Sequence, residues 1–112
     1  MDDELTLPII DIDALPDRTG WAVVTLSGAF RTPMAVRVLG AILIELFGGG
    51  VDTVTVDARG CDGLSPAACH VLVDAARYTR HAGGCLVAAG LTPQDRAVLR
   101  GYDTDHRLDL AR

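Results

Sequence analysis

The sequence predicts a small α/β domain, in which a mixed sheet of four to five strands starts with an antiparallel hairpin and carries about three helices. One observation is that residues 54–90 have the pattern of a buried strand, a connecting segment, a helix, a glycine pair and a second strand. This is the pattern of a crossover between parallel strands. A second observation is that two apolar runs come first, separated by a loop that ends at Gly20, and we expect them to pair antiparallel. No linker or repeat interrupts the chain, so we expect a single domain over residues 1–112.

Local patterns predict the first two strands and the first helix. Residues 5–15 carry the alternating run IIDID, and residues 21–26 form the second apolar run. A helix is predicted over 33–47, because Thr32 is a good N-terminal cap and proline is tolerated at the first helical position. The glycines at 48–50 end this helix.

The predicted helix over 33–47 is apolar around more of its circumference than a helix packed on one side requires. Its core stripe is expected to be Ala35, Val38, Leu39, Ile42 and Leu46. Further apolar residues fall outside that stripe, namely Val36, Leu43, Ile44 and Phe47. The excess predicts a second contact, made with the rest of the domain, with a second copy of the chain or with a partner.

The middle of the chain predicts a strand, a long loop and a helix. The strand VTV leads into Asp57, and the residues from there to Ala68 are expected to form a loop to which Asp57 hydrogen bonds. Ser65 is expected to cap the next helix, which begins at Pro66 and ends at the glycines 83–84. Its core stripe is expected to be Ala68, Val71, Leu72, Ala75 and Thr79.

The end of the chain predicts a short helix over 93–99, capped by Thr92, and a last strand near 107–110. Right-handed crossovers bring the carboxyl ends of parallel strands, and the helix starts that follow them, to one edge of a sheet. Helix starts offer unpaired backbone N–H groups. We therefore expect recognition to occur at that edge.

Three short runs, taken in order, resemble a known family. They are LSGAFR at 26–31, DARGCDGLSPAACHVL at 57–72 and GGCLV at 83–87. They are similar to the LSGELD turn, the signature containing DSSG and the glycine-glycine-strand step of the STAS domain (sulphate transporter and anti-sigma factor antagonist). The resemblance covers most of the chain. It implies a STAS-like fold and a regulatory, non-enzymatic function like that of a stand-alone anti-sigma factor antagonist, which binds a kinase-type anti-sigma factor.

The chain departs from the family at the positions that carry the phosphate switch. In family antagonists, a serine of the DSSG turn is phosphorylated by the kinase, and the unphosphorylated form binds that kinase. Alignment through residues 71–72 puts this turn on Ser65, Pro66, Ala67 and Ala68, so both usual acceptor positions, Pro66 and Ala67, lack a hydroxyl. Ser65 is the remaining candidate phosphoacceptor, although a capping role is favoured for it.

The resemblance implies a partner-binding surface made from two segments. In the first, acidic family positions have become Ala29 and Arg31, which predicts a changed partner. The predicted binding residues are Gly28, Ala29, Arg31, Thr32, Arg59, Asp62, Ser65, Pro66, Ala67 and Ala68. Two alternatives stay open. One is a scaffold or self-associating subunit that forms a homodimer through the helix at 33–47, and the other is a site for a small anion or nucleotide at a helix start.

Composition argues against several other classes. A net charge of −5 disfavours nonspecific binding to nucleic acid. The longest apolar stretch, 38–47, is too short to span a bilayer and contains Glu45, and no secretory signal pattern is present, so a cytoplasmic protein is expected. Cys61, Cys69 and Cys85 are odd in number and lack metal-binding spacing, so we expect no disulfide, metal or other cofactor. Cys69 and Cys85 are expected to be small core residues.

Catalysis is not expected either. His70, His81 and His106 are not accompanied by a recognisable set of nucleophile, base and orienting residue, and no glycine-rich phosphate-binding motif is present. Asp11 or Asp13 together with Asp57 resembles the acidic pocket of a response-regulator receiver. The chain has no lysine, however, which a receiver requires, and a receiver has a helix between its first two strands where this chain predicts a hairpin.

Overall fold

The predicted order of strands and helices is confirmed. A computed structural model describes residues 9–14, 20–103 and 108–110. Its elements in chain order are β1 (Ile9–Ala14), β2 (Trp21–Phe30), α1 (Pro33–Gly48), β3 (Thr53–Leu64), α2 (Pro66–His81), β4 (Cys85–Ala89), α3 (Pro93–Tyr102) and β5 (Leu108–Leu110). The strands form one sheet in the order β1-β2-β3-β4-β5, in which β1 is antiparallel to β2 and the other neighbours are parallel. The α/β class and the N-terminal hairpin are therefore confirmed.

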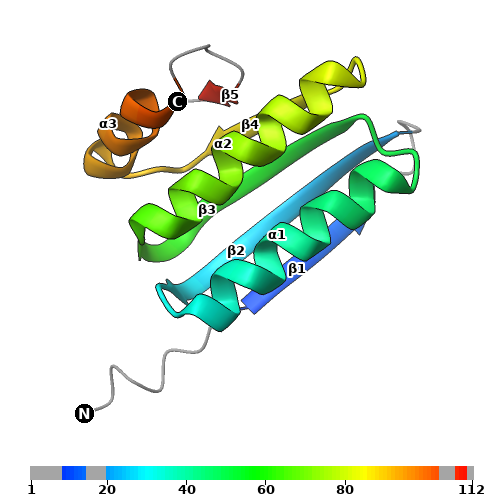
Figure 1. The fold of residues 1–112 in the computed structure, drawn as a ribbon. Coiled ribbons are helices and arrows are strands. Elements are labelled where there is room, and N and C mark those ends of the chain that lie inside the picture. The colour runs from blue at the N-terminus through cyan, green and yellow to red at the C-terminus, as the bar shows by residue number, and fades with distance from the viewer. Residues whose placement is uncertain (1–8, 15–19, 104–107, 111–112) are drawn as a thin grey trace.

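One face of the sheet is buried beneath helices because the strand residues alternate in direction. Along β2, every second residue from Ala22 to Phe30 is buried, and the residues between them are partly exposed. Val54 and Val56 on β3 and Leu86 on β4 continue this buried face. Figure 1 shows α1 and α2 side by side across it. The core lies between this face and the helices.

All three helices start in the same way. Each follows a serine or threonine whose hydroxyl accepts a hydrogen bond from a backbone N–H, and each has proline in its first turn. The three pairs are Thr32 Oγ1 with Ala35 N at 3.1 Å, Ser65 Oγ with Ala68 N at 3.2 Å, and Thr92 Oγ1 with Asp95 N at 3.1 Å. The three predicted caps are confirmed.

The buried stripe of α1 is rotated from the predicted one. Val36 and Leu43 fall outside the predicted stripe but are buried, whereas Val38 falls inside it but is 41 % exposed. The reason is that α1 packs against α2 as well as against the sheet, so its buried side turns toward α2. On α2, Val71 is only half-buried, in the groove that faces α1. Contacts within the domain thus bury some of the apolar residues of α1 outside the predicted stripe, such as Val36 and Leu43. Ile44, also outside that stripe, is 57 % exposed.

The two cysteines expected in the core differ in burial. Cys69 is buried in the core, as predicted. Cys85 is only half-buried, and its Sγ donates a hydrogen bond to Asp109 Oδ2 at 3.4 Å. The prediction for Cys85 was wrong because β4 buries only one face, through Leu86 and Ala88, and Cys85 lies on the other.

Candidate functional site

The segment between Asp57 and Ala68 is mostly strand and not the predicted loop. β3 continues to Leu64 and pairs with β2 as far as Phe30. Two register shifts along this pairing each put one extra residue into β3, as β-bulges do. They allow a strand of 12 residues to pair with a strand of 10 residues.

Glycines make the bulged pairing possible and explain why the sequence suggested a loop. Gly60 lies so close to β2 that a Cβ atom on it would be 2.9 Å from Ser27 Cβ. Gly63 has a φ of 115°, which side chains other than glycine rarely allow. Two closely spaced glycines are typical of a turn in sequence, but here they let an irregular strand stay in the sheet.

The two predicted binding segments lie side by side at the carboxyl edge of β2 and β3. The backbone N–H of Ser65 donates to the carbonyl oxygen of Phe30 at 3.2 Å. The Arg31 guanidinium lies near Gly63, since a Cβ atom on that glycine would be 3.6 Å from Arg31 Nη2. The parallel pairing of β2 with β3 therefore joins segments that are more than thirty residues apart in sequence.

Gly28 and Ala29 belong to β2 and not to the predicted turn. Gly28 has a φ of 87° and lies next to a register shift, so the strand is irregular there but continues to Phe30. Only Arg31 and Thr32, both exposed, lie between β2 and α1. The position of the family's LSGELD turn is thus occupied by the end of a strand.

The first turn of α2 presents a small surface at the same edge. Ser65 is half-buried, and its hydroxyl accepts the capping hydrogen bond from Ala68 N. Pro66 and Ala67 are exposed, whereas Ala68 is buried. The two positions that carry serine in the family are therefore open to solvent and have no hydroxyl. Negative charge is favourable in this turn because the first N–H groups of a helix lack intrahelical partners.

Arg59, within β3, extends the surface toward Gly90, which directly follows β4. Its Nε donates to Asp57 Oδ1 at 3.3 Å, and its backbone N–H donates to the same oxygen at 3.0 Å. The predicted hydrogen bonding between Asp57 and the residues that follow it is thus confirmed, with Asp57 as the acceptor, although the strand continues. Gly90, with a φ of 72°, packs against Arg59, and a Cβ atom there would press on Arg59 Cγ and N. Asp62 lies within β3, but its side chain is outside the described part of the structure.

Asp95 supports this edge, and the sequence pattern does not reveal it. Its side chain belongs to the first turn of α3 and is buried, and its Oδ2 accepts a hydrogen bond from the Leu64 backbone N–H at 3.2 Å. Leu64 is the last residue of β3, so this bond ties the start of α3 to the segment that leads into α2. The spacing of Thr92 and Asp95 signals a helix start. It does not signal a partner 31 residues away.

Cys69 and His70, two residues of types that often occur in catalytic sites, lie near the start of α2. Burial, and to a smaller extent the nearby Asp95 carboxylate, raises the pKa of the Cys69 thiol to about 11. The thiol is therefore protonated at neutral pH and is a poor nucleophile. His70 is exposed, and its ring makes an edge-to-face contact with Tyr102 at a centroid distance of 4.4 Å.

The hairpin contradicts the receiver alternative, because β1 pairs antiparallel with β2, which is the next element among the described residues. Asp11 and Asp57 both pair with Thr25, from opposite sides, so a strand separates the two carboxylates. Among the described residues, no group of three His, Cys, Asp or Glu side chains could hold a metal ion. Within the same part of the chain, no helix is both long enough and apolar enough to cross a membrane.

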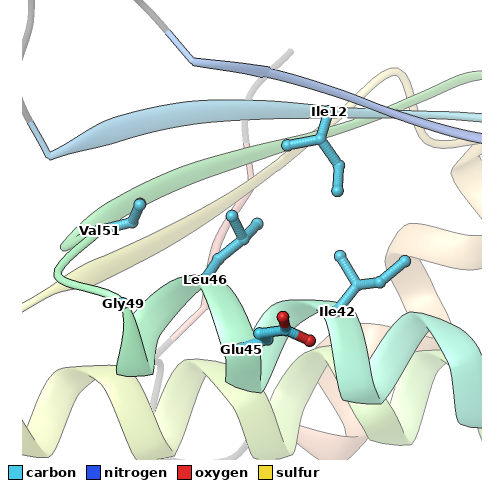
Figure 2. Close-up of a pocket in the computed structure, with 6 residues that line it drawn as sticks. All are labelled: Ile12, Ile42, Glu45, Leu46, Gly49 and Val51. Carbon is cyan, nitrogen blue, oxygen red and sulfur yellow. The ribbon is translucent and has the colours of Figure 1, made fainter.

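A hollow of about 320 Å³ lies between β1 and α1, and none of the predicted site residues lines it. In Figure 2, Ile12 points from β1 toward the helix, and Ile42 and Leu46 point from α1 toward the sheet. The side chain of Glu45 lies along the helix in the same view. The hollow leaves this side of α1 partly uncovered.

Comparisons with known proteins identify the fold. No protein-family model and no curated protein matches the sequence. Solved structures do match. The anti-sigma factor antagonist SpoIIAA in its unphosphorylated form superposes with a TM-score of 0.75 at 15 % identity, covering 93 % of this chain and 88 % of that one. SpoIIAA of Bacillus in its phosphorylated form gives 0.73 at 15 % identity, covering 93 % and 92 %.

A chain from a structure of the stressosome, described as a signal integration and transduction hub, gives a TM-score of 0.60 at 17 % identity, covering 90 % of this chain and 86 % of that one. The chain therefore has the fold of the STAS-domain anti-sigma factor antagonists, as its sequence motifs predict.

Proposed function

We propose that this chain is an antagonist-like regulatory module that binds a kinase-type anti-sigma factor, and that it acts by binding and not by catalysis. The observation that carries the proposal is the meeting of the segment at Arg31 with the segment at Ser65, at one edge of a STAS-like sheet. The proposed contact residues are the predicted ones that are exposed or half-buried, namely Ala29, Arg31, Thr32, Arg59, Ser65, Pro66 and Ala67, together with Asp62. Gly28 and Ala68, also predicted, are buried, so their proposed role is to support these residues. Because the proposed partner controls transcription, the proposed location is the cytoplasm.

The proposed binding is not switched off by phosphorylation in the usual way. Pro66 and Ala67 are exposed but cannot accept a phosphoryl group. Ser65 is half-buried, uses its hydroxyl oxygen as the cap of α2 and is followed directly by proline. A kinase would have to accept a shifted position and a proline beside the acceptor.

Calorimetry of the purified chain with the kinase-type anti-sigma factors of its own genome tests binding, first with ADP and then with ATP. We expect micromolar or tighter affinity to one of them. Ala67→Asp places a carboxylate at the usual acceptor position and should weaken binding about tenfold or more, because an unmatched charge in an interface costs affinity. The helix start tolerates the added negative charge, so the fold should be retained.

Ala67→Asn is the matched control, since it has nearly the same shape as the aspartate variant without its charge. It should bind far more tightly than Ala67→Asp. Absence of binding to every kinase-type anti-sigma factor of the genome would contradict the proposal.

Intact-mass analysis after incubation with the bound kinase and ATP tests the missing switch separately. We expect the mass of the chain to stay unchanged. Stoichiometric phosphate on Ser65 would refute the absence of a switch, and it would leave the proposed binding intact.

The second candidate function is that of a self-associating or scaffold subunit. The observation that favours it is the exposed apolar surface of α1, where Met34 is 65 % exposed and Ile44 is 57 % exposed. A stressosome chain is among the similar structures. Sedimentation tests self-association, and the calorimetry above tests kinase binding. A scaffold subunit self-associates without binding a kinase-type anti-sigma factor, whereas an antagonist binds one of them.

A further inference from the structure

The outer face of α1 combines exposed apolar side chains with few charges. Met34, Val38 and Ile44 are 65 %, 41 % and 57 % exposed. Single exposed apolar residues are normal on a protein surface, but three on one helix form a group. In addition, Ala41 is exposed between them. The helix thus presents a surface from which a contact would remove apolar area from water.

The only charged residues of α1 are Arg37 and Glu45, and both are exposed. They lie four residues before and four residues after Ala41. Residues four apart form a ridge along a helix surface, so Arg37, Ala41 and Glu45 share one ridge with a small residue at its centre. Within the described part of the chain, neither charge has an ion-pair partner.

We propose that this face binds the same face of a second copy, through an antiparallel pair of α1 helices related by a twofold axis near Ala41. When ridges of this kind align in two packed helices, the helices cross at about −50°. The ridge of one copy then runs antiparallel to the same ridge of the other. Arg37 of each copy lies beside Glu45 of the other copy, so a single contact forms two ion pairs.

The small residue at the crossing point permits close approach. Ala41 carries only a methyl group, so the helix axes can come within the 8–10 Å that is typical of packed helices. Val38 and Ile44 lie three residues on either side of Ala41 and flank the crossing point. Their exposed area would be buried by the contact, and the ion pairs would lie at its ends.

The charge pattern favours a second copy over a different partner. Arg37 and Glu45 lie at equal distances on either side of the uncharged Ala41. When a second copy is placed antiparallel to the first, each arginine therefore lies beside a glutamate of the other copy. A uniformly acidic or basic partner would match only one of the two charges and repel the other. The self-contact uses the outer face of α1, so it neither requires nor excludes binding of an anti-sigma factor at the carboxyl edge.

Sedimentation equilibrium over a range of protein concentrations tests the proposal. The wild-type chain should show a reversible monomer–dimer equilibrium. Arg37→Glu and Glu45→Arg should each weaken dimerisation about tenfold or more, because each substitution puts like charges together at both ends of the contact. An equimolar mixture of the two variants restores opposite charges at both ends, so it should form a one-to-one dimer. The double variant carrying both substitutions should dimerise like the wild type.

Arg100→Glu on α3 is the control, because it changes the net charge as much as Arg37→Glu at an exposed site outside α1. It should leave dimerisation unchanged. Ala41→Gln adds bulk at the crossing point and should also weaken the dimer, with unchanged circular dichroism showing that the fold is retained. The proposal is overturned if the wild type is monomeric at every soluble concentration, if Arg37→Glu leaves a dimer unaffected, or if the two variants do not pair.

Discussion

α1 and α2 are alike where they begin and different along their outer faces. Each has 16 residues, a hydroxyl cap and proline in its first turn. Yet α1 exposes Met34, Val38 and Ile44, whereas α2 exposes Tyr78 together with the charged or polar residues Asp74, Arg80 and His81. The cap determines where a helix starts, but it does not determine which molecule binds to the exposed face of that helix. This difference supports the two proposals, self-association through the outer face of α1 and partner binding at the carboxyl edge that includes the first turn of α2.

Replacing one core leucine in each helix tests whether the two helices are packed equally well, and it should have the largest effect. Leu39 and Leu72 are both fully buried. Leu39→Ala and Leu72→Ala should each lower the free energy of unfolding by about 2–5 kcal/mol, through lost transfer energy and an added cavity. Urea denaturation followed by circular dichroism measures the loss.

Met34→Ala, at an exposed site, is the control for these variants and should change the free energy of unfolding by less than about 0.5 kcal/mol in the monomer. A loss below about 1 kcal/mol for either leucine would mean that its helix is not packed as described.

Removing the caps tests the similarity of the two helix starts. Thr32→Ala and Ser65→Ala should each cost about 1 kcal/mol of unfolding free energy, because a first-turn N–H loses its side-chain acceptor. Ser65→Asp keeps a good capping acceptor and should retain most of the stability. An unchanged stability of Ser65→Ala would contradict the capping role of Ser65.

Cys69 adds a pH dependence to the stability of α2. The pKa of its thiol is raised from 9.0 to about 11 in the folded chain. Between these values the unfolded chain has lost the thiol proton and the folded chain has kept it, so the folded state binds more protons. This contribution to stability is complete below about pH 9 and is lost as the pH rises toward 11.

Urea denaturation at about pH 8 and about pH 10 measures this effect. The wild type should lose more stability between the two pH values than Cys69→Ala, which lacks the thiol. Equal losses in the two proteins would show that the thiol of Cys69 is not buried as described.

Local sequence signals predict most of the fold, and long-range contacts account for what they miss. Thr32 and Ser65 were correctly predicted as caps, because a cap and its acceptor lie within one turn. The continuation of β3 to Leu64 was not predicted, because its glycines resemble a turn until β2 is beside them. The buried carboxylate of Asp95 accepts a hydrogen bond from the backbone N–H of Leu64, which belongs to another element. The sequence around Asp95 therefore does not predict this hydrogen bond.

The candidate site itself stays a prediction, but the structure shows that its two predicted segments are neighbours. The motifs name the two segments, and the parallel pairing of β2 with β3 brings them together. The rotation of the buried side of α1 toward α2 could not be predicted. The spacing of apolar residues along a helix shows which side is apolar, but it does not show whether the sheet or another helix covers that side. Consequently Val38 is exposed where a buried residue was expected.

Calorimetry with one kinase-type anti-sigma factor, using the wild type, Ala67→Asp and Arg37→Glu, tests the division of tasks between the two helices most directly. We predict that the wild type binds, that Ala67→Asp loses about tenfold or more of the affinity, and that Arg37→Glu binds like the wild type. Loss of binding in Arg37→Glu together with full binding in Ala67→Asp would contradict the account, because it would put the partner on α1.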